Sequence, residues 1–193
     1  MRDRVRALAA AFLLAAAPTA GVALAAGFVA LDLPQRLAAA QEAVAGTVVD
    51  VDVVVRDGEP WTLVTLRVER WWRHAGDNVA PGPSVEAIGE TLTAAFWGGR
   101  APGAPALQVA GVPTFAAGER VVWLLRSSDD GLAAPTVGVS QGVWRSLSGA
   151  WVGDDGRTLG LDEDGRLALN GAPAPDAVLF DAIAAAFADL VAP

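Results

Sequence analysis

The sequence predicts one mainly β domain of short antiparallel strands, with a short N-terminal helix, a C-terminal hairpin and a C-terminal amphipathic helix. Three observations support this fold class. Apolar residues alternate with polar ones between residues 46 and 72, which is the two-residue period of a strand with one buried face. Clusters of Gly, Pro and Asp interrupt the chain at short intervals, so most strands must be brief. Apolar residues recur every three or four positions near both ends of the folded part, where helices are expected.

The first residues have the order of an export signal. Three arginines precede an uncharged apolar run, 7–17, and small residues then lead to Ala25. We therefore expect a signal peptide over residues 1–25, cleaved near Ala25, and a single domain over residues 26–193 that is secreted or periplasmic. The uncharged stretch is also long enough to span a bilayer, so an uncleaved N-terminal anchor is the alternative. No later segment reads as a membrane-spanning helix.

Composition limits the classes of function. Removal of the first 25 of the 193 residues leaves 168, which suffices for one self-sufficient core. The net charge is −8, and it becomes −10 without a leader that carries three Arg and one Asp. Such an acidic balance argues against nucleic acid and anionic membrane surfaces as partners. The chain has no Cys, so neither a disulfide nor a lipidation thiol is expected.

A short helix and then one long hairpin are expected after the leader. Pro34 suits the first turn of a helix that continues over residues 35–43. Valines alternate with acidic residues from 46 to 55, so that Val51 belongs to the buried face and Asp52 to the solvent face. The pair Asp57-Gly58 lies in a turn, and residues 61–72 alternate again, which completes the hairpin.

The remaining elements follow from shorter patterns. Strands are expected over residues 91–97, 120–126 and 142–152, and a second hairpin is formed by residues 157–161 and 166–169. Prolines and glycines between residues 98 and 118 exclude a central strand or a long helix, so this segment is expected to be a long loop. The C-terminal helix begins with Asp176 as its N-cap and presents Leu179, Ile183, Phe187, Leu190 and Val191 on one stripe.

One motif raises the possibility of a hydrolase. Residues 138–142 match the G-x-S-x-G pattern of a nucleophile elbow, with Ser140 at its centre. That elbow needs a helix after the serine, whereas the residues that follow here read as a strand. His74 is the only histidine and would have to act as the general base, although it precedes the serine in the chain. An exported serine hydrolase using Ser140 and His74 is therefore an alternative, and no catalytic residue is assigned.

Two acidic loops raise the possibility of a calcium site. Asp154 and Asp155 lie in the first loop, and Asp162 and Asp164 lie in the second. Carboxylate-rich loops suit calcium, but the spacing does not match an EF-hand, and Asp-Gly pairs are common hairpin turns. A zinc site is not expected, because the chain has only one His and no Cys to bind the metal. A calcium-dependent binding module is the second alternative, and no cofactor is expected.

Two adjacent tryptophans are the candidates for a binding surface. Trp71 and Trp72 must point to opposite faces of a regular strand, so one of them is expected to leave the main core. An outward-facing Trp can stack on a sugar or on a partner chain. Core packing is the alternative interpretation for aromatic residues in strands.

Three segments together carry a resemblance to a known kind of domain. They are residues 45–48, residues 62–70, and residues 112–122 ahead of Gln141-Gly142. The region from Glu42 to Trp144 resembles a small β-barrel found in many bacterial exported proteins of unassigned role, similar to the OB-like fold of netrin and metalloprotease-inhibitor modules. The resemblance implies an antiparallel OB-like barrel and brings no catalytic residues with it. This chain lacks the N-terminal cysteine of the inhibitor modules.

These observations favour an exported, non-enzymatic β-barrel module. We expect it to bind a protein or polymer at the cell envelope, or to serve a structural role there. The missing catalytic constellations and the outward-facing tryptophan support this expectation. We expect no nucleic-acid partner, and no membrane span once the signal is removed.

Overall fold

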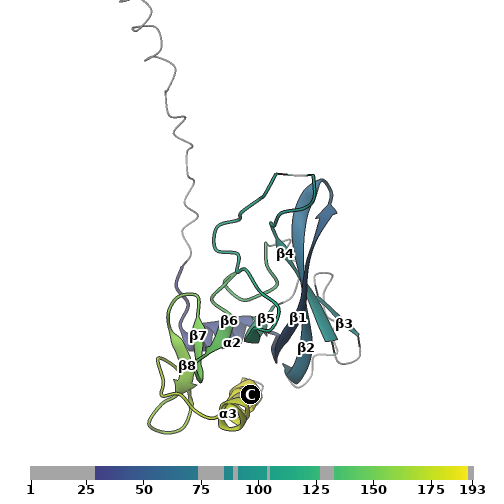
Figure 1. Ribbon diagram of the computed structural model, residues 1–193. Coiled ribbons are helices and arrows are strands. Elements are labelled where there is room, and N and C mark those ends of the chain that lie inside the picture. Colours follow the sequence, from purple (N-terminus) through teal and green to yellow (C-terminus); the bar gives the residue numbers. More distant parts are fainter. Residues whose placement is uncertain (1–28, 74–84, 89–90, 104, 127–132, 191–193) are drawn as a thin grey trace, which may run out of the picture.

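A computed structural model describes residues 29–73, 85–88, 91–103, 105–126 and 133–190 (Figure 1). Nine strands form one antiparallel sheet in the order β3-β4-β2-β1-β5-β6-β7-β8-β9. The strands are β1 (Glu42–Arg56), β2 (Glu59–Arg73), β3 (Val85–Ile88), β4 (Thr91–Trp97), β5 (Arg120–Leu125), β6 (Val143–Leu147), β7 (Ala150–Gly153), β8 (Thr158–Leu161) and β9 (Leu167–Leu169). The helices are α2 (Leu33–Ala39) and α3 (Asp176–Asp189).

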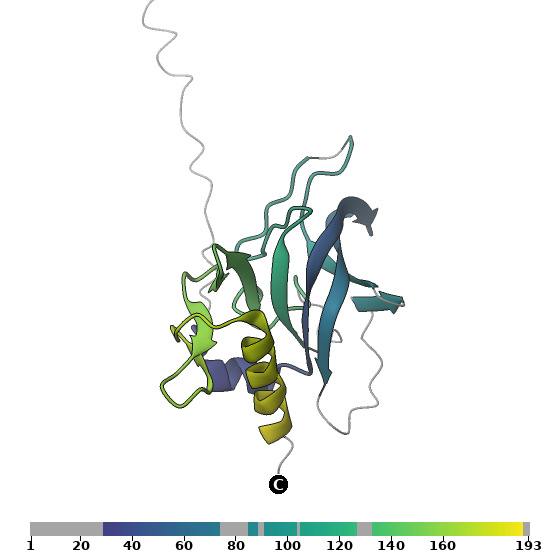
Figure 2. The same cartoon turned by 60° about the horizontal axis from the view of Figure 1, so that its bottom comes forward.

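The mainly β fold class is confirmed, but the sheet is open. Its edges are β3 and β9, and no ladder joins these two strands in the part of the chain that the structure describes. A closed OB-like barrel is therefore not confirmed. The physical reason lies in α3, which contacts β2, β8 and β9 and so covers one face of the curled sheet between β2 and the β8–β9 end (Figure 2). The apolar stripe of a helix thus covers this face, where a barrel would be closed by strand pairing.

The centre of the sheet is buried on both faces. The helix-side core joins the apolar faces of both helices to one face of the sheet, and it includes Val122, Leu124 and Trp144. The loop-side core lies on the other face and includes Val121 and Trp123. Alternate residues of β5 therefore enter different cores, which is why this strand is a continuous apolar run.

Two β-bulges interrupt the pairing of β1 with β2, between Ala45 and Gly46 and between Val48 and Asp50. The extra residue is Glu69 of β2 in the first bulge and Val49 of β1 in the second, and it reverses the facing only of the residues that follow it in its own strand. Val48 and Val51 consequently both contact the loop-side core, whereas Val49 is exposed. The prediction of a single unbroken alternation from residue 46 was therefore wrong at Val49.

Several boundaries differ from those the sequence predicts. Helix α2 ends at Ala39, because β1 already begins at Glu42. The single strand expected over residues 142–152 is the β6–β7 hairpin, since Ser148 and Gly149 both have positive φ, 51° and 84°, and form a turn. Strand β3 was not predicted.

The C-terminal helix starts at Asp176 as predicted, but Asp176 is not its N-cap. Pro175 occupies that position and makes no side-chain cap bond. The predicted stripe holds for Leu179, Ile183 and Phe187, which are buried, whereas Leu190 is exposed. Val191, the last residue predicted for the stripe, lies outside the described residues. Neither helix within the described ranges has the length and hydropathy that a bilayer crossing requires.

Candidate functional site

A cleft of about 260 Å³ opens on the loop-side face between the β1–β2 hairpin and the loop of residues 98–118. The loop runs beside the upper part of this hairpin (Figure 1). The cleft is lined by Val51, Val53, Thr62, Phe96, Trp97, Gly98, Gly99, Leu107, Gln108, Val109, Val112, Pro113, Thr114 and Phe115. None of these residues carries a charge, and apart from Trp97 only Thr62, Gln108 and Thr114 have polar side chains. The cleft therefore suits an uncharged, mostly apolar group.

Two glycines hold the near end of the loop against the hairpin. Gly98 and Gly99 have φ values of +107° and +134°, which residues with side chains rarely adopt. A Cβ on Gly99 would lie 2.7 Å from the Thr62 Oγ1 atom and 3.0 Å from a Val53 methyl carbon, so no side chain fits there. The Thr62 hydroxyl donates to the Gly98 carbonyl at 2.7 Å, and Gly99 and Leu107 exchange two backbone hydrogen bonds.

Arg145 holds the far end of the loop. Its Nη2 atom donates to the Thr114 carbonyl at 2.8 Å, and its guanidinium carbon lies 5.2 Å from the centre of the Phe115 ring. The same guanidinium forms ion pairs with Glu119 and Asp154. The Phe115 ring packs 5.1 Å from the Trp123 ring in the loop-side core. With both ends of the loop fixed, the cleft is formed before any ligand arrives.

Trp97 lines this cleft, but its indole N–H is enclosed by the protein. Its indole Nε1 atom is buried, and it has no hydrogen-bond partner among the described residues. A buried N–H group without a partner costs the folded protein about 1–3 kcal/mol relative to one that is hydrogen-bonded. The Nε1 atoms of Trp123 and Trp144 are buried without a partner in the same way, so the Trp97 N–H does not by itself mark a ligand site.

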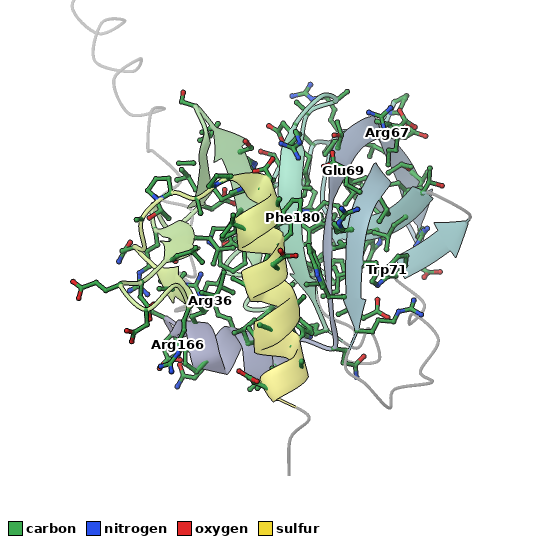
Figure 3. All side chains as sticks on the ribbon, turned by 90° about the horizontal axis from the view of Figure 1, so that it is seen from below. Arg36, Arg67, Glu69, Trp71, Arg166 and Phe180 are labelled. Atoms are coloured by element: carbon green, nitrogen blue, oxygen red, sulfur yellow. The ribbon has the colours of Figure 1, made fainter. Side chains whose placement is uncertain are left out.

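A second polar cluster surrounds Arg36 of α2, whose side chain is fully buried (Figure 3). Its guanidinium donates to the Leu31 carbonyl at 3.0 Å, the Gln141 carbonyl at 2.6 Å and the Asp155 carboxylate at 2.6 Å. Burial raises the pKa of Asp155, but hydrogen bonds from Arg36 and from the backbone N–H of Arg157 outweigh it and hold the pKa below its usual value. All three acceptors are protein groups, so this cluster is a structural anchor.

The G-x-S-x-G motif lies beside this anchor. Val139 has a φ of 65°, and Ser140 lies in a turn that leads into strand β6, not into a helix. Gln141 accepts a hydrogen bond from the Leu31 N–H at 2.7 Å and donates to the Val29 carbonyl at 2.9 Å. The motif thus docks the N-terminal segment onto the sheet. His74, the other half of the expected hydrolase pair, lies outside the described residues.

Three of the four acidic loop residues bind protein groups through their carboxylates, and Asp164 is exposed. Asp154 pairs with Arg145, and Asp155 pairs with Arg36. The Asp162 carboxylate accepts the backbone N–H groups of Asp164 and Arg166, which closes its own turn. Within the described ranges, no three His, Cys, Asp or Glu side chains gather where they could hold a metal ion.

Trp71 and Trp72 point to opposite faces of β2, as the sequence predicts, but each packs against one of the two cores. The Trp72 ring lies 5.5 Å from the Phe180 ring of α3 in an edge-on arrangement. The Trp71 indole donates to the Glu42 carboxylate at 3.0 Å, and the Arg73 guanidinium stacks on its ring. Both tryptophans are half-buried, because the sheet is covered on both sides.

A third polar cluster fastens α3 to the sheet. Arg120 donates to the carboxylates of Glu69 at 2.7 Å and Asp176 at 2.8 Å, and the Trp151 indole donates to Asp176 at 3.0 Å. The hydrogen bond from Arg120, helped by one from Thr47 and opposed by burial, lowers the pKa of Glu69. The two carboxylates raise the pKa of Arg120 through the same hydrogen bonds.

No protein-family model, curated protein or solved structure matches this chain. The functional argument therefore depends on the geometry of the cleft. Sequence analysis missed the cleft, although Gly98-Gly99 directly after a predicted strand was a usable signal, because glycine in a strand region often marks close approach of another segment.

Proposed function

We propose that this protein is an exported, non-enzymatic binding module that takes one uncharged apolar group of a protein or polymer into the cleft beside the β1–β2 hairpin. The observation that carries the proposal is the preformed, charge-free lining of that cleft. Burial of apolar surface in this cleft supplies the driving force.

The size of the cleft favours a group that belongs to a larger molecule. Pockets for complete small ligands usually measure about 300–1,000 Å³. A volume of about 260 Å³ suits an aromatic ring or a branched aliphatic side chain. A macromolecule that presents such a group at the cell envelope agrees with the export signal expected from residues 1–25.

Binding, not catalysis, is also favoured by how the reactive side chains are used. The carboxylates of Glu69, Asp154, Asp155 and Asp176 are paired with arginines. Ser140 lies in the turn that anchors the N-terminal segment. The cleft itself contains no acid, base or charged nucleophile.

A neutral fluorescent probe tests the proposal. Nile red is uncharged and apolar, and we expect it to bind the protein saturably, with a change in tryptophan emission. Val109→Phe adds bulk to the cleft lining and should weaken binding about tenfold, which corresponds to about 1.4 kcal/mol. Val178→Phe, on the exposed face of α3, is the matched control and should not change the affinity. Absence of binding, or equal weakening by both substitutions, would contradict the proposal.

A further inference from the structure

The outer edge of β1 has no strand partner over residues 50–56, as far as the described residues show. Strand β5 pairs with β1 only as far as Thr47, and Val48 then exchanges backbone hydrogen bonds with Gly118 and Glu119. Beyond this point, no described segment hydrogen-bonds to the outer edge of residues 50–56. Such an edge is a template for another strand.

The register identifies which backbone groups point outward. Arg56 and Glu59 flank the two-residue turn and therefore form a hydrogen-bonded pair. Because bonded and non-bonded pairs alternate, the N–H and C=O groups of Val51, Val53 and Val55 face away from β2. The Asp52 carboxylate accepts the Val53 N–H at 2.8 Å, as expected for a donor without a strand partner.

We propose that this edge pairs antiparallel with the same edge of a second copy of the chain, about a two-fold axis that passes through Val53. In this register Val53 lies opposite its counterpart, and Val51 of each copy lies opposite Val55 of the other. All three outward-facing residues then take part in hydrogen-bonded pairs. The Asp52 carboxylate releases the Val53 N–H to the second copy and turns to solvent.

Charge complementarity selects a second copy as the occupant. The axis at Val53 places the exposed Asp50 of each copy opposite the exposed Arg56 of the other. These are non-hydrogen-bonded positions, where facing side chains are closest. An axis at Val51 would instead oppose Asp50 to Asp52, and an axis at Asp52 would oppose that carboxylate to itself.

A slip of the axis in the other direction is also less favourable. With the axis at Val54, Val51 would lie opposite the turn residue Asp57, so part of the edge would stay unpaired. The proposed register therefore uses the available edge most completely. It also keeps the clefts of the two copies on one face of a continuous sheet, because a two-fold axis normal to the sheet preserves its faces.

Disulfide trapping tests the register, and the absence of Cys from the natural chain makes a single introduced thiol unambiguous. Cα atoms of a bonded pair lie about 5.5 Å apart, within the range that a disulfide spans. We expect the full-length Val53→Cys protein to form a covalent dimer on mild oxidation. Val55→Cys is the matched control: Val55 is 55% exposed, but its counterpart lies four residues along the strand, about 13 Å away.

The charge pairs are tested separately by sedimentation equilibrium on the full-length chain. Arg56→Asp opposes two carboxylates at each pair and should raise the dimer dissociation constant about tenfold or more. Asp50→Arg combined with Arg56→Asp should restore dimerisation. Thermal melts check that each variant is folded. Because the Asp50 and Arg56 side chains are exposed, we expect folded variants.

Three results would overturn the proposal: a monomer at every concentration tested, equal cross-linking of the two cysteine variants, or a charge swap that fails to restore the dimer. A monomer whose edge is instead occupied by an extended polypeptide from another protein counts among them. None of these results bears on the cleft, so the two proposals fail independently.

Discussion

Replacement of Asp155 by Ala tests the account of the buried Arg36 anchor. The Arg36 side chain is fully buried, and Asp155 is its only carboxylate partner among the described residues. Loss of one partner from a fully buried ion pair usually costs about 3–5 kcal/mol, because the remaining charge stays buried. Asp155 is 28% exposed and two carbonyl acceptors remain, so we expect a cost somewhat below this range, about 2–3 kcal/mol.

The assay is equilibrium urea unfolding at neutral pH, followed by tryptophan fluorescence and analysed as a two-state transition. The exposed Asp164 is the matched control, and Asp164→Ala should change the free energy of unfolding by less than about 0.5 kcal/mol. The double substitution Arg36→Met with Asp155→Ala should cost less than the sum of its parts, by about 1–3 kcal/mol, because the groups are in contact. A loss below about 0.5 kcal/mol for Asp155→Ala, or strict additivity, would refute the reasoning.

Three further outcomes are expected. Val51→Asp buries a carboxylate against the loop-side core and should cost about 2 kcal/mol, whereas Asp52→Val should change stability by less than about 0.5 kcal/mol; equal costs in urea unfolding would show that the faces are misassigned. The pKa of Glu69 is lowered in the folded state, so its contribution is complete above the unfolded pKa near 4.5 and is lost as the pH falls through the lower folded value. Stability measured from pH 6 to pH 3 should therefore fall less steeply in Glu69→Gln than in the natural protein, and parallel curves would argue against the Arg120 bond. A chelator should leave the melting temperature unchanged, because the acidic loops are closed by arginines and backbone N–H groups; a fall would reveal a stabilising metal.

Local patterns in the sequence predicted most of the elements. The Asp57-Gly58 turn, strand β4 and the β8–β9 hairpin occupy the expected places, because turn chemistry and two-residue alternation determine them over a few residues. The start of α3 at Asp176 was also predicted.

The sequence pattern could not show how the sheet is completed. Closure depends on contacts between distant segments, and here Leu179 and Phe180 of α3 fill the space beside β2, β8 and β9. The bulge at Val49 also escaped sequence analysis, because one extra residue changes the face of the strand without changing its composition. The β6–β7 turn was missed because strand-like residues continue on both sides of Ser148-Gly149, so the sequence reads as one strand.

For the candidate site too, local features were predicted from the sequence and contacts between distant segments were not. Trp71 and Trp72 were correctly assigned to opposite faces, but the prediction assumed one core and the sheet has two. The cleft depends on a loop that crosses from Gly98 to Phe115 over β1 and β2. No local periodicity encodes such a crossing. The Gly98-Gly99 pair is its one local sequence signal, whereas the hydrogen bond from Arg145 to the Thr114 carbonyl joins segments that are distant in the sequence.

The central claim is that the cleft beside the β1–β2 hairpin is the binding site. The most direct measurement is an NMR titration of the seven tryptophan indole N–H signals with an uncharged apolar probe. The account predicts that the signal of Trp97, which lines the cleft, shifts most, whereas those of the buried Trp123 and Trp144 change little. A shift confined to other tryptophans, or none at saturating probe, would contradict it.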